Sequence, residues 1–238
     1  MTAEPGRESL HGWSLAMAIA SLAAMAVWIA APDLLSPRAA TAAYTAWALG
    51  AFGYLFARIA GHRRWADIVT GVRVLLCVLL FASYALEPRP AWWKVAVAIA
   101  IIVLDAVDGA LARREGTTER GAVFDMESDA FYLVTMCAIA CVYLGVHPLV
   151  FVIGALRPLY VCIWAVLRFF IAPRSPNRKG SQRGRVIHLL LVIALIADLS
   201  PFIPLDAKTA IAAGAAALIG YSYAVDIWAT RAAAPAEP

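Results

Sequence analysis

Long apolar runs, separated by short stretches of polar residues, glycine and proline, extend over most of the chain. Eight of these runs have the length of about 20 residues that a helix needs to cross the hydrocarbon core of a bilayer. They cover residues 12–32, 40–60, 66–86, 91–113, 120–144, 147–172, 184–203 and 207–230. The pattern predicts an all-α, multi-pass membrane protein. We expect the first run to be a retained span, because it is too long for the apolar region of a signal peptide.

Composition and charge support this interpretation. Hydrophobic residues make up 63% of the chain, charged residues only 15%, and the mean hydropathy is +0.75. Soluble domains carry about 25% charged residues, so no separate soluble domain is expected. With both termini on one side, 14 of the 20 lysines and arginines fall on that side and 4 on the other, while Arg73 and Arg157 lie within spans. The positive-inside rule then makes this side cytoplasmic, and the net charge of +4 reflects topology rather than nucleic-acid binding.

Four aspartates interrupt the apolar pattern in the fourth and fifth runs. Asp105 and Asp108 are three residues apart, and Asp125 and Asp129 are four apart, so each pair shares one face of a helix. A carboxylate within a span costs about 2.5–3.5 kcal/mol on insertion scales. The short connection over about 114–120 predicts antiparallel neighbours whose carboxylates meet at the cytoplasmic end. Such a convergence indicates a site for a hard divalent cation.

Small and basic residues are interleaved with these acids. Gly109 and Ala112 lie on the same side as Asp108, which allows a ligand to approach closely. Arg113 is placed to bind a phosphate with its planar guanidinium, and Gly121 is expected to leave free backbone N–H groups near an anion at the start of the next helix. Together they favour a diphosphate-containing substrate that a metal neutralises, with one carboxylate left to take a proton from an incoming hydroxyl.

Two other functions fit intramembrane acids. The four aspartates are also compatible with a proton or cation relay in a transporter, which would not need the small residues. A non-catalytic membrane scaffold is the third hypothesis, and it leaves the intact acidic set without an explanation. The interleaved glycine, alanine and arginine favour nucleotide binding over both.

The order D-x2-D-G-x2-A-R-x7-G-x3-D-x3-D resembles the signature of the CDP-alcohol phosphotransferases. All eight fixed positions are occupied, by Asp105, Asp108, Gly109, Ala112, Arg113, Gly121, Asp125 and Asp129. The resemblance covers about 62–230, and it implies a six-helix core formed by residues 62–238. Residues 1–61, a polar tail and an accessory hairpin of two spans, lie outside it.

The resemblance implies a membrane enzyme that moves a phosphatidyl-type group from a CDP-linked lipid to an alcohol and releases CMP. Asp105, Asp108 and Asp125 would bind the metal, and Asp129 would act as the base and also contact a pair of Mg²⁺ or Mn²⁺ ions. The residues expected to line the CDP site are Gly109, Ala112, Arg113 and Gly121. We expect CDP-diacylglycerol as donor, glycerol 3-phosphate or another polar head-group alcohol as acceptor, and a homodimer in a bacterial-type inner membrane.

A second, weaker motif lies in the third span. Family members often enter the core with Asn-x-x-Thr-x-x-Arg, and here Thr70 and Arg73 match while Asp67 replaces the asparagine. Thr70 is therefore expected either to contact the CDP part of the substrate or to serve local helix packing.

Three basic residues are candidates for binding the acceptor. Arg157, deep in the sixth span, is expected to pair with an acid or to contact an acceptor phosphate. Lys179 and Arg183 belong to the basic stretch 173–185, whose simpler interpretation is topology alone. His188, on an apolar helix, is interpreted as a packing residue.

Overall fold

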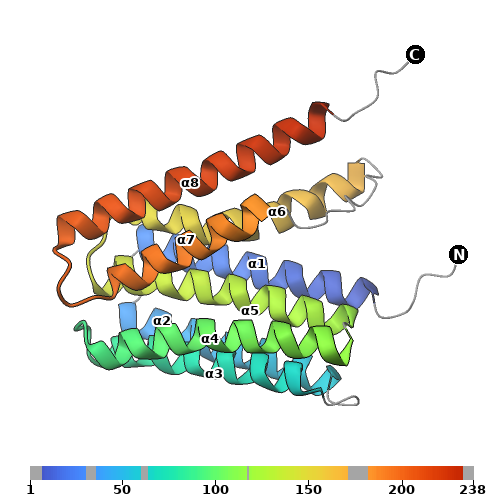
Figure 1. The fold of residues 1–238 in the computed structure, drawn as a ribbon, viewed down its shortest axis with the longest axis horizontal. Helices are drawn as coiled ribbons and strands as arrows, with labels where there is room; N and C mark the ends of the chain where they lie inside the picture. Colours follow the sequence, from blue (N-terminus) through green and yellow to red (C-terminus); the bar gives the residue numbers. More distant parts are fainter. Residues whose placement is uncertain (1–6, 31–35, 60–63, 117, 171–181, 233–238) are drawn as a thin grey trace, which may run out of the picture.

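The computed structural model describes residues 7–30, 36–59, 64–116, 118–170 and 182–232, and every regular element within them is helical (Figure 1). The eight α-helices are α1 (Arg7–Ala30), α2 (Pro37–Ile59), α3 (Trp65–Leu86), α4 (Trp92–Glu115), α5 (Glu119–Ala138), α6 (Phe151–Phe170), α7 (Gln182–Asp198) and α8 (Leu205–Ala232). A π-helical turn, η2 (Ile139–Tyr143), extends α5, and a 3₁₀ turn, η3 (Pro148–Val150), precedes α6. The all-α prediction is confirmed, and each of the eight apolar runs overlaps one α-helix.

Five segments of the described chain are long and apolar enough to cross a membrane. They are Leu10–Ala30, Trp65–Leu86, Trp92–Glu115, Glu119–Tyr143 and Pro148–Val166, and the apolar part of α7 is the shorter Val186–Asp198. This protein is therefore a multi-pass membrane protein.

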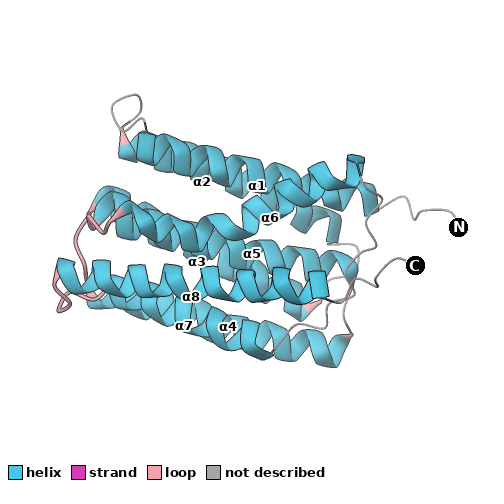
Figure 2. Cartoon of the chain, turned by 90° about the horizontal axis from the view of Figure 1, so that it is seen from above, coloured by secondary structure: helices cyan, strands magenta, loops and turns pink. Residues whose placement is uncertain are grey.

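The helices run up and down, so that α1 begins and α8 ends at the same end of the bundle (Figure 1). Seen from above, α1, α2 and α6 lie along one flank, α4, α7 and α8 along the other, and α3 and α5 between them (Figure 2). The central helix α5 packs against α1, α2, α3, α6 and α7, and its span is the most deeply buried of the five. Its aspartates are therefore held in the middle of the bundle.

Aromatic side chains attach the N-terminal hairpin to the rest of the bundle. Trp28 of α1 meets Phe81 of α3 edge to face, with ring centroids 5.8 Å apart, and Tyr44 of α2 lies 5.7 Å from Phe131 of α5. Such contacts add specific geometry to a large buried apolar area. The proposed boundary after residue 61 falls in a segment outside the described residues, and it stays a prediction.

Lys94 holds the connection between α3 and α4 in place. Its side chain is fully buried, and its ammonium donates hydrogen bonds to the carbonyl oxygens of Glu87, at 2.5 Å, and Arg89, at 3.1 Å. The ammonium also lies 4.0 Å from the centre of the Tyr84 ring, a cation–π contact. In the sequence, Lys94 appears only as a charge on the non-cytoplasmic side. In the structure, it links the α3–α4 connection to α4.

Candidate metal and nucleotide site

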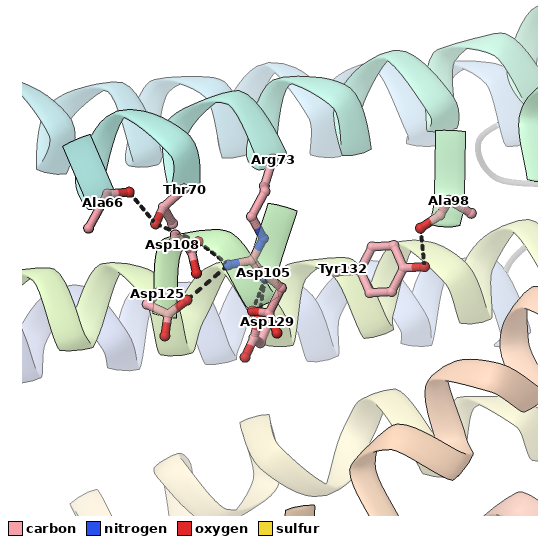
Figure 3. Close-up of polar contacts among 9 residues, drawn as sticks. All are labelled: Ala66, Thr70, Arg73, Ala98, Asp105, Asp108, Asp125, Asp129 and Tyr132. Atoms are coloured by element: carbon pink, nitrogen blue, oxygen red, sulfur yellow. Dashed lines mark hydrogen bonds and ion pairs between the residues drawn. The ribbon is translucent and has the colours of Figure 1, made fainter. Parts of the chain in front are cut away.

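The four aspartates converge as the sequence predicts (Figure 3). The second half of α4 provides Asp105 and Asp108, and α5 provides Asp125 in its first half and Asp129 at its middle. Oxygen atoms of Asp105, Asp108 and Asp125 lie within 4.8 Å of one another. Asp108 is buried, with 3% of its side chain exposed, whereas Asp105, Asp125 and Asp129 are 42%, 44% and 31% exposed. The cluster therefore has one buried side and one accessible side.

Arg73 of α3 occupies the buried side of this cluster (Figure 3). Only 3% of its side chain is exposed. Its Nη2 lies 2.6 Å from Oδ1 of Asp105 and 2.5 Å from Oδ1 of Asp129, and its Nη1 lies 2.6 Å from Oδ2 of Asp108 and 2.9 Å from Oδ1 of Asp125. A single guanidinium thus holds one oxygen of each carboxylate, in a fixed fork geometry that lysine lacks.

The remaining carboxylate oxygens fit a divalent cation. Oδ1 of Asp108 is buried and has no hydrogen-bond partner among the described residues. An uncompensated buried oxygen is costly, and hard cations such as Mg²⁺ and Mn²⁺ take carboxylate oxygens. Asp105, Asp108 and Asp125 therefore form a suitable ligand set for one ion, with Asp129 beside them on Arg73.

The turn between α4 and α5 brings the two pairs of acids together. Gly116 ends α4 with φ of +85°, a left-handed conformation that glycine adopts without strain. Thr118 is the N-cap of α5, and its Oγ1 accepts a hydrogen bond of 3.1 Å from the Gly121 N–H. Free N–H groups were expected at this helix start, but the N–H of Gly121 itself is used by the cap. A Cβ at Gly121 would lie 2.9 Å from Oδ1 of Asp67 and 2.9 Å from Oγ1 of Thr118, which explains the glycine by close approach instead.

A cavity of about 230 Å³ adjoins this turn. All five residues expected at the CDP site line it, together with two of the aspartates; the lining includes Thr70, Gly109, Ala112, Arg113, Gly121, Asp108 and Asp125. The single hydroxyl proton of Thr70 can be donated to the Ala66 carbonyl oxygen, 3.1 Å from Oγ1, or to Oδ2 of Asp108, 2.9 Å from it, so Thr70 serves helix packing and also contacts the acid. Asp67, buried and also in the wall, has an Oδ2 without a hydrogen-bond partner in the described chain.

Two larger cavities reach the acids from the side of α7. One of about 480 Å³ is lined by Arg73, Asp105, Asp129, Tyr132 and His188, among others. The other, of about 410 Å³, lies among α5, α6, α7 and α8, and its wall includes Asp129, Arg157, Tyr160 and His188. His188 was interpreted from sequence as a packing residue, but it faces both cavities. The sequence could not predict that His188 lines these cavities, because this depends on how α7 packs against α4 and α5.

Arg157 pairs with an acid, which was one of its two alternatives, and contact with an acceptor phosphate stays a prediction. Its Nη2 lies 2.5 Å from Oε1 of Glu127, which is only 4% exposed, so it pairs with an acid. It also lines the cavity that contains Asp129. Lys179 and the side chain of Arg183 lie outside the described part of the structure, and their roles stay predictions.

Comparison with known proteins agrees with the signature residues. The family model for CDP-alcohol phosphatidyltransferase matches residues 63–228, which is well over half of the chain. Searches of curated proteins and of solved structures gave no match. The matched range begins with the α3 helix and contains all four aspartates, Arg73 and the cavities around them. The chain belongs to the CDP-alcohol phosphatidyltransferase family.

Proposed function

We propose that the protein transfers a phosphatidyl group from CDP-diacylglycerol to the hydroxyl of an alcohol, releasing CMP, in phospholipid biosynthesis. The observation that carries this proposal is the meeting of four carboxylates with a glycine- and alanine-lined cavity inside a membrane bundle of this family. The site would face the cytoplasm of a bacterial-type inner membrane, with both termini on that side, as the distribution of basic residues favours.

The donor would bind through the small cavity beside the α4–α5 turn. Gly109, Ala112 and Gly121 leave room for the nucleotide, and Arg113 offers a cation for its diphosphate. When bound, Mg²⁺ or Mn²⁺ ions held by Asp105, Asp108, Asp125 and Asp129 would supply further positive charge to the diphosphate. Arg73 keeps those carboxylates pointing inward, so their positions are set before substrate arrives.

Asp129 is the proposed general base. It lines both larger cavities, which gives it access to a hydroxyl that the small cavity does not offer. Its carboxylate would accept the hydroxyl proton. The hydroxyl oxygen would then form a bond to the β-phosphorus, which carries the diacylglycerol, while the bond from that phosphorus to the bridging oxygen breaks and CMP leaves with the electron pair.

The acceptor is proposed to occupy the cavity of about 410 Å³, because this cavity joins Asp129 to Arg157. Arg157, Lys179 and Arg183 would contact it, and glycerol 3-phosphate is the first candidate. A cavity of about 610 Å³ on the other side of Arg157 is lined by Leu10, His11, Ser14 and Leu15 of the accessory helix α1. We propose that this helix helps to form the entrance for lipid or acceptor, and that the protein functions as a homodimer.

The test is CMP release by the purified protein with CDP-diacylglycerol and Mg²⁺ or Mn²⁺, over a panel of phosphorylated, uncharged, cationic and lipid alcohols. Acceptor-dependent CMP release is expected, and the panel identifies the alcohol. Folded protein that binds no CDP and carries cations across proteoliposomes without CMP release would replace this proposal with the cation-relay hypothesis.

A further inference from the structure

We propose that Arg73 sets the order of metal binding, so that the acidic site holds one divalent ion by itself and a second only together with the nucleotide diphosphate. This inference rests on the proposed metal-dependent function, and it adds an order of binding that the transfer reaction does not require.

Arg73 is built into the site rather than placed transiently beside it. Its side chain is almost completely buried in α3, and it contacts all four carboxylates within 2.9 Å. Its Nε is buried without a hydrogen-bond partner in the described chain, so the guanidinium is held by its two terminal nitrogens, both of which contact carboxylates. Removing such a cation from its carboxylates would leave buried charges uncompensated. We therefore expect Arg73 to stay when metal binds.

The charge on the cluster then limits how many ions it accepts. In their ionised forms, four carboxylates and one guanidinium carry a net charge of −3. One divalent ion leaves −1, which suits a partly buried site. A second ion alone would make the cluster +1, which is unfavourable in an environment that solvates charge poorly. A second ion that arrives with a diphosphate, carrying one negative charge on each phosphoryl group, leaves the total at −1.

The geometry supports the same count. Asp105, Asp108 and Asp125 have oxygens within 4.8 Å of one another, as a single ion requires, and Asp129 is not part of that group. The unpartnered Oδ1 of Asp108, whose side chain is 97% buried, lies in this set of three. The chain therefore presents one tight set of protein ligands, and a second ion depends on oxygens that the substrate brings.

The experiment measures Mn²⁺ bound to the full-length protein in detergent, by the loss of the free-ion electron paramagnetic resonance signal. The wild type is expected to bind one Mn²⁺ alone and two in the presence of CDP. CDP should tighten the second ion at least about tenfold, within the usual range of coupling between two sites. Cytidine, which lacks the diphosphate, should leave the count at one.

Variants separate charge from simple structural support. Arg73→Gln removes the positive charge and should bind two Mn²⁺ ions without CDP, whereas Arg73→Lys keeps the charge and should retain the wild-type count. Arg89→Gln, which removes a charge from the exposed α3–α4 connection, is the matched control and should behave as wild type. If Arg73→Gln does not fold, the wild-type counts with and without CDP still test the order of binding, and Arg73→Met is the second charge-removing variant, expected to bind two Mn²⁺ ions without CDP.

Two outcomes overturn this inference alone: two ions in the wild type without CDP, or one ion both with and without it, in each case with acceptor-dependent CMP release intact. Folded wild type that binds no Mn²⁺ in any condition would overturn the metal-dependent function as well.

Discussion

Gly109 and Gly121, two of the glycines that line the cavity of about 230 Å³, should differ sharply in their tolerance of alanine. A Cβ at Gly121 would lie 2.9 Å from both Oδ1 of Asp67 and Oγ1 of Thr118, closer than real Cβ contacts allow. A Cβ at Gly109 would meet only the flexible end of Arg113, at 3.4 Å. Gly121→Ala must therefore displace the N-cap of α5 or a buried carboxylate, and Gly109→Ala need displace neither.

The magnitudes follow from helix energetics. Alanine is favoured over glycine by about 0.8–1.0 kcal/mol in a helix interior, so Gly109→Ala should be neutral or stabilising. In Gly121→Ala the loss of the cap costs about 1 kcal/mol, and moving Asp67 adds to it. We expect a difference of about 1–2 kcal/mol between the variants. At about 2–4 °C per kcal/mol for a chain of this size, Gly121→Ala should have a Tm about 2–8 °C below that of Gly109→Ala.

Thermal unfolding of both variants in the same detergent, followed by intrinsic fluorescence, measures this difference. CDP binding is measured in parallel, because Gly109→Leu should fill the cavity and weaken CDP binding while keeping the Tm near that of wild type. A Gly121→Ala protein as stable as Gly109→Ala would refute the steric explanation of Gly121.

Three further predictions concern the acids and their partners. Asp129→Asn should lower CMP release about 10²–10⁴-fold, as loss of a general base does, with an unchanged Tm; the exposed Asp206→Asn is its control, and CMP release at the wild-type rate would exclude the role of base. Glu127→Met should destabilise the protein by about 3–5 kcal/mol because it leaves Arg157 without its partner. Adding Arg157→Met should recover most of that loss in detergent unfolding, and equal stability of the single and double variants would show that the pair is not coupled. Chelation with EDTA should abolish CMP release, and added Mg²⁺ or Mn²⁺ should restore it. Full CMP release by the EDTA-treated protein would exclude a requirement for metal.

The features that could be predicted from the sequence lie within one helix or across one short turn. The spacing of Asp105 and Asp108 fixes a shared face, and the brief connection to α5 brings Asp125 near them, so their convergence was predictable. The length and hydropathy of the apolar runs were likewise sufficient for the helices. These are local properties, determined by helical periodicity and by the thickness of a bilayer.

Features that depend on how separate helices are rotated against each other were not accessible. Arg73 was visible only as a motif match, and its contact with all four acids requires the placement of α3 against α4 and α5. The pairing of Arg157 with Glu127 was one of two alternatives until α6 was placed. The role of the Gly121 N–H was mispredicted because of a neighbouring residue. Thr118, three residues earlier, accepts a hydrogen bond from that N–H, so it is not free for an anion.

The separation of the cavities around the four aspartates has a kinetic consequence. The small cavity beside the α4–α5 turn and the larger one containing Arg157 have no lining residue in common within the described chain, yet each reaches the acidic cluster. Donor and acceptor placed in them do not exclude each other, so both can be present before any bond changes. If the proposed donor and acceptor sites are filled together, the transfer would be direct within a ternary complex. The expected result is then sequential steady-state kinetics and inversion of configuration at the transferred phosphorus, and a ping-pong pattern would indicate a covalent phosphatidyl-enzyme instead.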